Sequence, residues 1–334
     1  MSTVKGPASG LPVLVILMLV GALLITGCTT AGQASTGTSV GTPSSLSTRS
    51  SAGPNGETLT QPTTPAPADS GTGLPAQPPV SPSPTAVSPV GPAPAAQLQP
   101  AGVPGVNDPS CTSADRPVVL LHGTFSSVKA DFTALVPALL ATDRCVYGIN
   151  YGNGGIASVR QSAADVTAFI DQVLAETGAS QVDVIGFSQG GLVLRTGLRL
   201  TGLAPKVAVA VLVAPSFHGS TSPLLTALPA GVCPACADQA AGSALLTELD
   251  AGGDLDGEVR YAVVSSANDT IVTPVAAQVP QGPADRVSSV LVQDNCPAEL
   301  VDHVSLRADP GVLAWVVDAL QTGGSPDPTA LTCA

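Results

Sequence analysis

A single serine lies between two glycines in the segment VDVIGFSQGG, residues 182–191, directly after an apolar run. Residues 186–190 match the pattern G-x-S-x-G, a nucleophile elbow in which a sharp strand-to-helix turn exposes the serine hydroxyl. Side chains two positions before and after the serine would collide in such a turn, so both positions must be small. The pattern therefore predicts that Ser188 is a nucleophile for acyl transfer. The alternative interpretation is a glycine-flanked turn that serves only packing.

A serine hydroxyl becomes a good nucleophile when a base takes its proton, usually a histidine that a carboxylate orients. The chain has three histidines. Behind an elbow of this kind the order along the chain is serine, acid, histidine. His122 comes too early for that order, and His218 leaves no room for an acid-bearing strand. His303 is therefore the predicted base, and the alternative is a surface histidine beside Asp302.

The acid is expected just past a strand between the serine and His303. Asp269 follows an apolar run and precedes the segment 271–274, IVTP, and it is the predicted acid. Asp294 follows the next apolar run and is the alternative. Four further aspartates in a Gly- and Ala-rich region are expected to lie in a cap or in loops, exposed to solvent: Asp238, Asp250, Asp254 and Asp256.

Acyl transfer also requires hydrogen-bond donors for the oxyanion of the tetrahedral intermediate. The backbone N–H that follows the nucleophile belongs to Gln189. The second donor should come from the loop after the first strand, LHGT at residues 121–124. We expect it to be the N–H of Thr124, with the Thr124 hydroxyl as a possible third donor. His122 is then a structural residue that supports this loop.

Strand-like and helix-like segments alternate through residues 110–334. A parallel sheet with helices on both faces is expected from this order, with polar groups collected beyond the carboxyl ends of its strands. The best helix is 158–177, with apolar residues at three- and four-residue spacing, Ser158 as N-cap and Gly178 just past its end. The other predicted helices are 189–200 and 310–320, and the predicted strands are 117–121, 146–151, 182–187, 207–213, 258–264 and 287–292.

The domain resembles an α/β-hydrolase lipase, similar to the secreted class 2 bacterial lipases and to the Candida antarctica lipase B type. Four segments carry the resemblance, in order: LHGT (121–124), GFSQGG (186–191), SSANDTIVTP (265–274) and VDH (301–303). It implies the α/β-hydrolase fold and hydrolysis of triacylglycerols or other esters without a metal or another cofactor. It also implies that Ser188, Asp269 and His303 form the catalytic triad.

The sequence departs from that family in three respects. The N-terminal region is unlike that of a freely secreted lipase. Phe187 stands in the elbow where many relatives have His or Trp. The pair Cys233 and Cys236 has no counterpart in the family, and we favour a local structural disulfide there over a redox pair or a zinc site.

The N-terminal region predicts export and attachment to a membrane. Residues 1–27 resemble a lipoprotein signal peptide, because a short apolar run ends in Ile-Thr-Gly before Cys28. Cys28 is the predicted lipidation site, although an ordinary signal peptide with an incidental cysteine is possible. Residues 28–109 are expected to be a disordered linker, since 16 of the 32 prolines lie within them and only four residues are charged. Residues 110–334 form the predicted catalytic domain.

Six cysteines remain after Cys28, an even number that indicates three disulfides in an exported domain. The resemblance implies one bridge near the start of the domain and another that spans the catalytic histidine. The predicted pairs are Cys111 with Cys145, Cys233 with Cys236, and Cys296 with Cys333.

Charge excludes one class of function. The net charge is −12 and no Lys/Arg cluster occurs, so nucleic-acid binding is not expected. A monomer is expected, anchored by lipid to the outer face of a bacterial cell membrane. The predicted activity is ester hydrolysis of lipids or other acyl esters through an acyl-enzyme. The alternatives are a cell-envelope acyltransferase with the same triad and an inactive hydrolase-fold binding lipoprotein.

Overall fold

The computed structural model describes residues 98–99 and 101–333. The predicted signal peptide, Cys28 and the linker up to residue 97 lie outside these residues. Among the residues that are described, no helix is both long and apolar enough to cross a lipid bilayer.

Six parallel strands form one sheet in the order β2-β1-β3-β4-β5-β6. They are β1 (Val118–Leu121), β2 (Val146–Ile149), β3 (Val182–Phe187), β4 (Val207–Val213), β5 (Arg260–Ser265) and β6 (Val287–Leu291). All six were predicted within a few residues. Five of them are mostly buried and largely apolar, as parallel strands covered on both faces are. The edge strand β6 is only partly buried and carries Ser288 and Ser289. The chain order reverses between β1 and β3, which are neighbours, and ligands of such sheets bind at this switch point.

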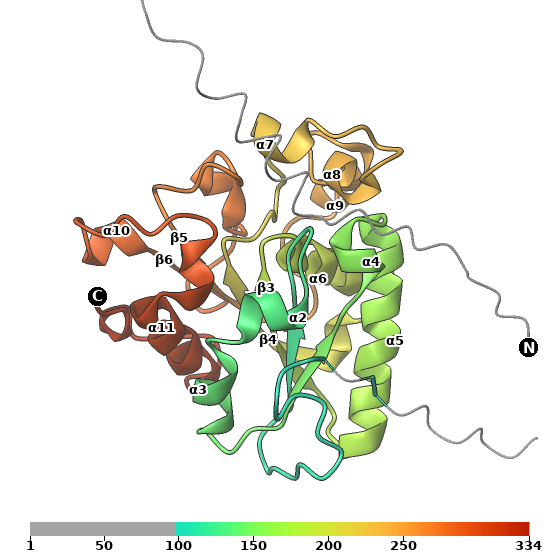
Figure 1. Cartoon of the computed structure of the whole chain (residues 1–334), viewed down its shortest axis with the longest axis vertical. Helices are drawn as coiled ribbons and strands as arrows, with labels where there is room; N and C mark the ends of the chain where they lie inside the picture. The colour runs from blue at the N-terminus through green and yellow to red at the C-terminus, as the bar shows by residue number, and fades with distance from the viewer. Residues whose placement is uncertain (1–97, 100, 334) are drawn as a thin grey trace, which may run out of the picture. The chain divides into compact units, whose positions relative to one another are not determined.

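Helices cover both faces of the sheet, as Figure 1 shows. One face packs on α5 (Val159–Thr177), α6 (Gln189–Leu200) and α9 (Ala244–Asp250). The other packs on α2 (Val128–Phe132), α3 (Val136–Leu140) and α11 (Pro310–Gln321). The remaining helical segments are α4 (Gly152–Gly155), η2 (Ala204–Lys206), α7 (Pro223–Thr226), α8 (Pro234–Asp238), η3 (Val275–Gln278), α10 (Val292–Asn295), η4 (Ser305–Ala308) and η5 (Pro328–Ala330). The arrangement is the α/β-hydrolase fold.

Alternate residues of each strand supply the two cores, as the two-residue period of a strand requires. In β1, Val119 and Leu121 belong to the core under α5 and α6. Val118 and Leu120 belong to the core under α2, α3 and α11. All four are fully buried. Because both faces are covered, no position in this strand can be polar without losing core contacts.

The long helix α5 begins and ends where its sequence predicts. The Ser158 hydroxyl accepts a hydrogen bond from Gln161 N at 3.3 Å, so it caps the first turn. Gly178 follows the last turn in the left-handed conformation, with φ of 70°, where glycine is favoured.

The folded domain begins before residue 110, so the predicted end of the linker at residue 109 is too late. Ala101, Val103 and Val106 are buried in the core that α2 and α3 cover. Val106 pairs with Val146 of β2, and Asn107 exchanges side-chain hydrogen bonds of 2.8 Å with Gly148 N and O. This segment therefore lies along the free edge of β2, the outermost strand.

The three disulfides join the cysteines that the sequence analysis paired: Cys111–Cys145, Cys233–Cys236 and Cys296–Cys333. The first links the N-terminal segment to the residue before β2. The second closes the first turn of α8. The third encloses the 36 residues between Cys296 and Cys333, which include His303.

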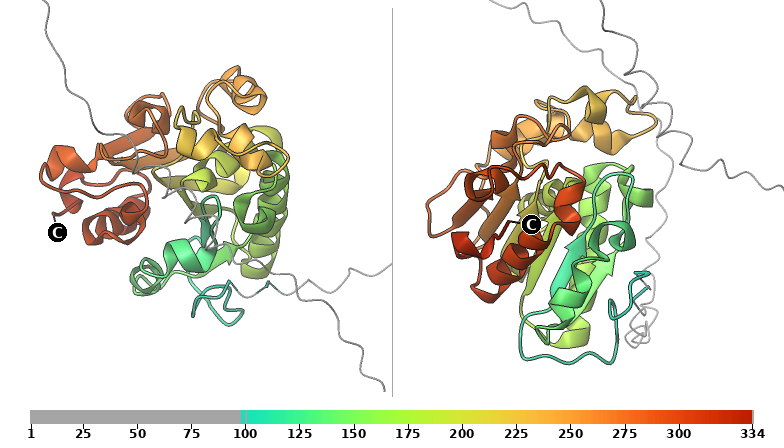
Figure 2. Two further views of the ribbon diagram at one scale, coloured as in Figure 1. Left: turned by 45° about the horizontal axis from the view of Figure 1, so that its top comes forward. Right: turned by 60° about the vertical axis from the view of Figure 1, so that its left-hand side comes forward.

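The segment between β4 and β5 carries α7, α8 and α9. In Figure 1 these three helices gather at the top of the view, and the same segment stays at the top in the right-hand view of Figure 2. The short helix α8 is tied to the end of α4, where Ala235 N donates to Ile156 O at 3.2 Å, and to the start of α5, where Asp238 accepts from Val159 N at 2.8 Å. It therefore has a fixed place beside the sheet.

Candidate active site

Ser188 stands on a strained turn between β3 and α6. Its φ of 54° lies in the left-handed region, which a non-glycine residue rarely adopts. A Cβ at Gly186 would lie 2.9 Å from the Gly190 carbonyl carbon, and one at Gly190 would lie 2.2 Å from Leu121 O. Both glycines are therefore required for the chain to pass through this turn. These contacts match the steric argument that the elbow pattern suggests.

The structure brings Ser188, His303 and Asp269 together, although they follow three different strands. His303 Nε2 lies 3.0 Å from Ser188 Oγ, and His303 Nδ1 lies 2.7 Å from Asp269 Oδ2. The three residues are 5%, 5% and 4% exposed in that order, so these contacts are shielded from bulk water. The Phe187 ring packs beside the His303 ring, with centroids 5.2 Å apart.

Four donors surround the carboxylate of Asp269. Oδ1 accepts from the backbone N–H groups of Ile271 (2.8 Å) and Val272 (2.9 Å). Oδ2 accepts from Gln278 Nε2 at 2.8 Å as well as from His303. The carboxylate is thus held in one orientation with Oδ2 toward the imidazole. Asp294, the alternative acid, is exposed on α10 and makes no hydrogen bond to His303 among the described residues.

The loop after β1 lies against the nucleophile. A Cβ at Gly123 would lie 3.3 Å from Ser188 Cβ, so the backbone of this loop touches the elbow. Thr124 follows on that loop. Gln189 is the first residue of α6, and its N–H lies at a helix N-terminus, where backbone N–H groups lack helical acceptors and favour negative charge. Gln189 thus follows Ser188 directly in the chain, and Thr124 follows Gly123, the residue whose backbone touches the elbow.

Comparison with known proteins identifies the family. Residues 115–282, half of the chain, match the model of the family described as lipase (class 2). The chain belongs to the class 2 lipase family. No match to a curated protein sequence is found.

Two solved structures show the same fold as this class 2 lipase. Lipase B of Aspergillus fumigatus is 23% identical over 70% of the chain, with a TM-score of 0.60. Phospholipase PlaB of Legionella pneumophila is 13% identical over 66% of the chain, with a TM-score of 0.50. The match spans 58% of the Aspergillus protein and 61% of the Legionella protein, less than two thirds of either.

His122 is a buried structural residue. Its Nδ1 donates to Gly123 O at 2.8 Å, its Nε2 accepts from Tyr151 N at 3.2 Å, and its ring stacks on Tyr151 at 4.2 Å. Burial lowers the pKa of His122 below its ordinary value, because the charged imidazolium would lose its hydration. The ring is therefore neutral, with its proton on Nδ1, and it supports the loop that carries Thr124.

Asp131 provides a second support for the same loop. Its fully buried carboxylate accepts from Gly123 N at 2.8 Å and from Ser126 Oγ at 2.6 Å, and it pairs with Arg307 at 2.6 Å. Arg307 lies in η4, four residues after His303. One carboxylate thus joins the loop after β1 to the segment that carries His303. No sequence pattern points to the pair of Asp131 and Arg307, because the two residues lie 176 positions apart in the chain.

His218 lies in a cluster of ion pairs that does not include Ser188. Two of the four aspartates that were predicted to be exposed to solvent have largely buried side chains in this region. Asp254 and Asp256 have side chains only 9% exposed, because Asp254 pairs with Arg195 and His218 and Asp256 pairs with Arg199. His218, Asp250 and Asp254 are residue types that can bind a metal ion, and their potential ligand atoms lie within 4.8 Å of one another. The buried Arg195 guanidinium already contacts both of those carboxylates, at 2.9 and 3.1 Å, and so neutralises them.

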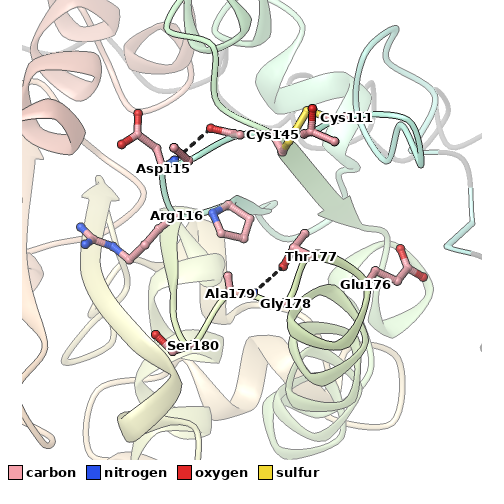
Figure 3. Close-up of a pocket in the computed structure, with 13 residues that line it drawn as sticks. Cys111, Asp115, Arg116, Cys145, Glu176, Thr177, Gly178, Ala179 and Ser180 are labelled. Carbon is pink, nitrogen blue, oxygen red and sulfur yellow. Dashed lines mark hydrogen bonds between the residues drawn. A yellow bond between two sulfur atoms is a disulfide. The ribbon is translucent and has the colours of Figure 1, made fainter.

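A pocket of about 400 Å³ lies beside the amino ends of three strands of the sheet (Figure 3). Its walls are the residues that precede β1, β2 and β3, with Arg116, Cys145 and Glu176 among them. Ser188 and Thr124 follow the carboxyl ends of these strands. The pocket is therefore separate from the candidate active site.

Proposed function

We propose that this class 2 lipase is a serine carboxylic-ester hydrolase that acts on lipids or other acyl esters outside the cell. One observation carries the proposal: Ser188 on a strained elbow, in hydrogen-bond contact with His303, which Asp269 orients. This is the order and geometry of a nucleophile, a base and an orienting acid. Ser188, His303 and Asp269 are thus the proposed catalytic triad.

In the proposed reaction, Ser188 Oγ attacks the ester carbonyl and passes its proton to His303 Nε2. Asp269 stabilises the imidazolium that forms. The tetrahedral oxyanion accepts hydrogen bonds from the N–H groups of Gln189 and Thr124. His303 then gives the proton to the departing alkoxide, which leaves as an alcohol. A water molecule, deprotonated by His303, attacks the acyl-enzyme in the same way, releasing the carboxylic acid and restoring Ser188 Oγ–H.

Apolar side chains near these residues support an apolar acyl substrate. Phe125 directly follows Thr124 and is 52% exposed. Leu300 and Val304 flank His303 and are 85% and 50% exposed. Exposed apolar side chains next to site residues in the chain favour contact with an apolar partner over contact with water alone.

The cellular setting belongs to the same proposal. Three disulfides are consistent with an oxidising compartment outside the cytosol. The proposed lipid anchor at Cys28 and the linker that follows it would hold the enzyme at the cell surface, and both lie outside the described residues.

Replacement of the nucleophile tests the function. Ser188→Ala should lower hydrolysis of p-nitrophenyl esters by at least about 10³-fold, since the chemical step loses its nucleophile. The wild type should be labelled by a fluorophosphonate, and the variant should not. A series of esters from short to long acyl chains, with and without an alcohol acceptor, then distinguishes an esterase, a lipase and an acyltransferase. Unlabelled wild type, or a variant within tenfold of its rate, would refute the assignment.

A further inference from the structure

Two glutamine side chains donate to the hydroxyl of Thr124. Gln239 Nε2 lies 2.9 Å from Thr124 Oγ1, and Gln189 Nε2 lies 3.2 Å from it. Gln239 and Gln189 are both fully buried. Gln239 comes from the segment after α8, and Gln189 is the residue after the nucleophile. Thr124 is therefore held from two sides by residues that are distant in the sequence.

Backbone carbonyls fix which end of each amide faces Thr124. Gln239 Nε2 also lies 3.1 Å from Ala235 O, and Gln189 Nε2 lies 2.8 Å from Gly155 O. A carbonyl oxygen can only accept a hydrogen bond, so the nitrogen of each amide must be on that side. The oxygen of the Gln239 amide is in turn the acceptor for Ser216 Oγ, at 3.0 Å. Both amides thus present an N–H group to the threonine.

These contacts determine what the Thr124 hydroxyl can do. A hydroxyl group has two acceptor positions and one proton. The two amides fill the acceptor positions, and within the described part of the chain the hydroxyl donates to no protein acceptor. Its proton is left for a ligand oxygen. The loop of Thr124 touches Ser188 through Gly123, so the hydroxyl belongs to the loop beside the nucleophile.

We propose that Gln239 is a positioning residue for the oxyanion site, and that the Cys233–Cys236 disulfide holds Gln239 in place. The Gln239 amide donates a hydrogen bond to the Thr124 hydroxyl oxygen. The hydroxyl proton is thereby directed to the oxyanion formed from an ester substrate. This inference rests on the proposed function, because it assigns a role within the same reaction.

The disulfide has a direct structural link to Gln239. Gln239 follows α8, a helix of five residues, and helices this short are not stable by themselves. The bond between Cys233 and Cys236 closes its first turn, and Cys233 Sγ accepts from Cys236 N at 3.1 Å. Both cysteines are fully buried. The α8 turn is therefore fixed covalently just before the residue that contacts Thr124.

A double-mutant cycle separates this role from a general effect on packing. Gln239→Met keeps the length of the side chain and removes the amide, and Thr124→Val keeps the shape and the N–H but removes the hydroxyl. If Gln239 acts through the Thr124 hydroxyl, Gln239→Met should lower kcat in the wild type but not in Thr124→Val, where that hydroxyl is absent. A packing defect would persist in both backgrounds. Asp238→Ala is the matched control, because Asp238 also joins α8 to another segment but does not contact Thr124.

The measurements are kcat and KM on a p-nitrophenyl ester and the rate of inactivation by a p-nitrophenyl phosphonate, whose phosphoryl oxygen occupies the oxyanion site. Thr124→Val should lower kcat by about 10²-fold, the lower end for a lost oxyanion donor. Gln239→Met should lower kcat and the inactivation rate by about 10-fold, with KM within about threefold of the wild type. In the Thr124→Val background it should change either rate by less than about threefold. Asp238→Ala should keep kcat within about threefold, whatever its effect on Tm.

The disulfide is tested in the same way. The double variant Cys233→Ser/Cys236→Ser should lower kcat. The fold-decrease in kcat that it causes should be clearly smaller in the Gln239→Met background than in the wild type. Equal factors in both backgrounds would show that the disulfide acts by another route. An unchanged kcat for Gln239→Met, or a loss that persists beside Thr124→Val, would overturn the role of Gln239. Failure of the proposed function gives a different result, because Ser188→Ala would then retain activity.

Discussion

Replacing Asp269 by asparagine should abolish the proposed ester hydrolysis by reversing the hydrogen bonding of His303. The backbone N–H groups of Ile271 and Val272 both point at Oδ1, so the asparagine oxygen must take that position. Its NH2 group then replaces Oδ2, 2.7 Å from His303 Nδ1. An NH2 group facing Nδ1 requires the imidazole to carry its proton on Nε2. The imidazole can then no longer accept the proton of Ser188.

The size of the effect follows from that change of tautomer. The same change in a serine-protease triad lowers kcat about 10⁴-fold, which corresponds to about 5.5 kcal/mol of transition-state stabilisation. A second cost falls on stability, because Gln278 Nε2 would face the new NH2 group. Gln278 cannot simply turn over, since its Nε2 also donates to Val272 O at 3.0 Å. One buried donor without an acceptor destabilises the domain by about 1–3 kcal/mol.

Steady-state hydrolysis of a p-nitrophenyl ester and thermal unfolding by circular dichroism measure the two effects of Asp269→Asn. The expected result is a loss of about 10⁴-fold in kcat with a decrease of a few °C in Tm. Asp294→Asn is the control, because that residue is exposed, and it should leave kcat within about threefold. Activity of Asp269→Asn within about 10-fold of the wild type, or a greater loss for Asp294→Asn, would refute the reasoning.

Three further predictions concern stability and location. Asp183→Asn should lower Tm by about 6–15 °C without changing kcat per folded molecule. The reason is that Arg144, whose side chain is 8% exposed, loses the carboxylate that it contacts at 2.6 Å. A shift in Tm below about 2 °C in differential scanning calorimetry would contradict this prediction. His122 has a folded-state pKa below its unfolded value of 6.5, so its contribution to stability is complete above that pH and is lost as the pH falls toward the folded pKa. Urea titrations between about pH 5 and pH 7 should show this slope, at most about 1.4 kcal/mol per pH unit, in the wild type and not in His122→Gln. Cys28→Ala should move activity from the membrane to the soluble fraction of cells, and a variant that stays on membranes as strongly as the wild type would exclude a lipid anchor at Cys28.

Local pattern explains why the sheet could be predicted from the sequence. Every strand except β6, which carries two serines, is a largely apolar run that can be recognised alone, and alternate residues of β1 do belong to different cores. The contact among Ser188, Asp269 and His303 follows from the same source. Each residue comes just after the carboxyl end of a strand or on a loop at that edge, and parallel strands bring these ends to one edge.

Contacts between distant residues could not be predicted in the same way. Asp254 and Asp256 are buried because Arg195 and Arg199 of α6 pair with them, and nothing near these aspartates in the sequence indicates those partners. The amide of Gln239 is similar, since a glutamine after a short helix has no pattern that points to Thr124. Each of these side chains acquires its role only when the segment between β4 and β5 packs against α6 or against the loop after β1.

Residues 101–109 were assigned to the linker for a different reason. Averaged composition made them resemble the proline-rich residues before them, yet three small apolar side chains among them are buried, at Ala101, Val103 and Val106. Small apolar residues at such spacing match no helix or strand period. Their burial depends on the surface that α2, α3 and β2 present.

The placement of this segment beside β2 bears on how the protein behaves in concentrated solution. A sheet whose outermost strand is free exposes a row of unpaired N–H and C=O groups, which a second chain can extend. Here Val106 and Asn107 occupy part of that row, and Cys111 is bonded to Cys145 next to it. A recombinant form that starts at residue 110 would keep every residue of the candidate active site but would bare the β2 edge. Such a form should self-associate and precipitate where one that starts before residue 98 remains monodisperse.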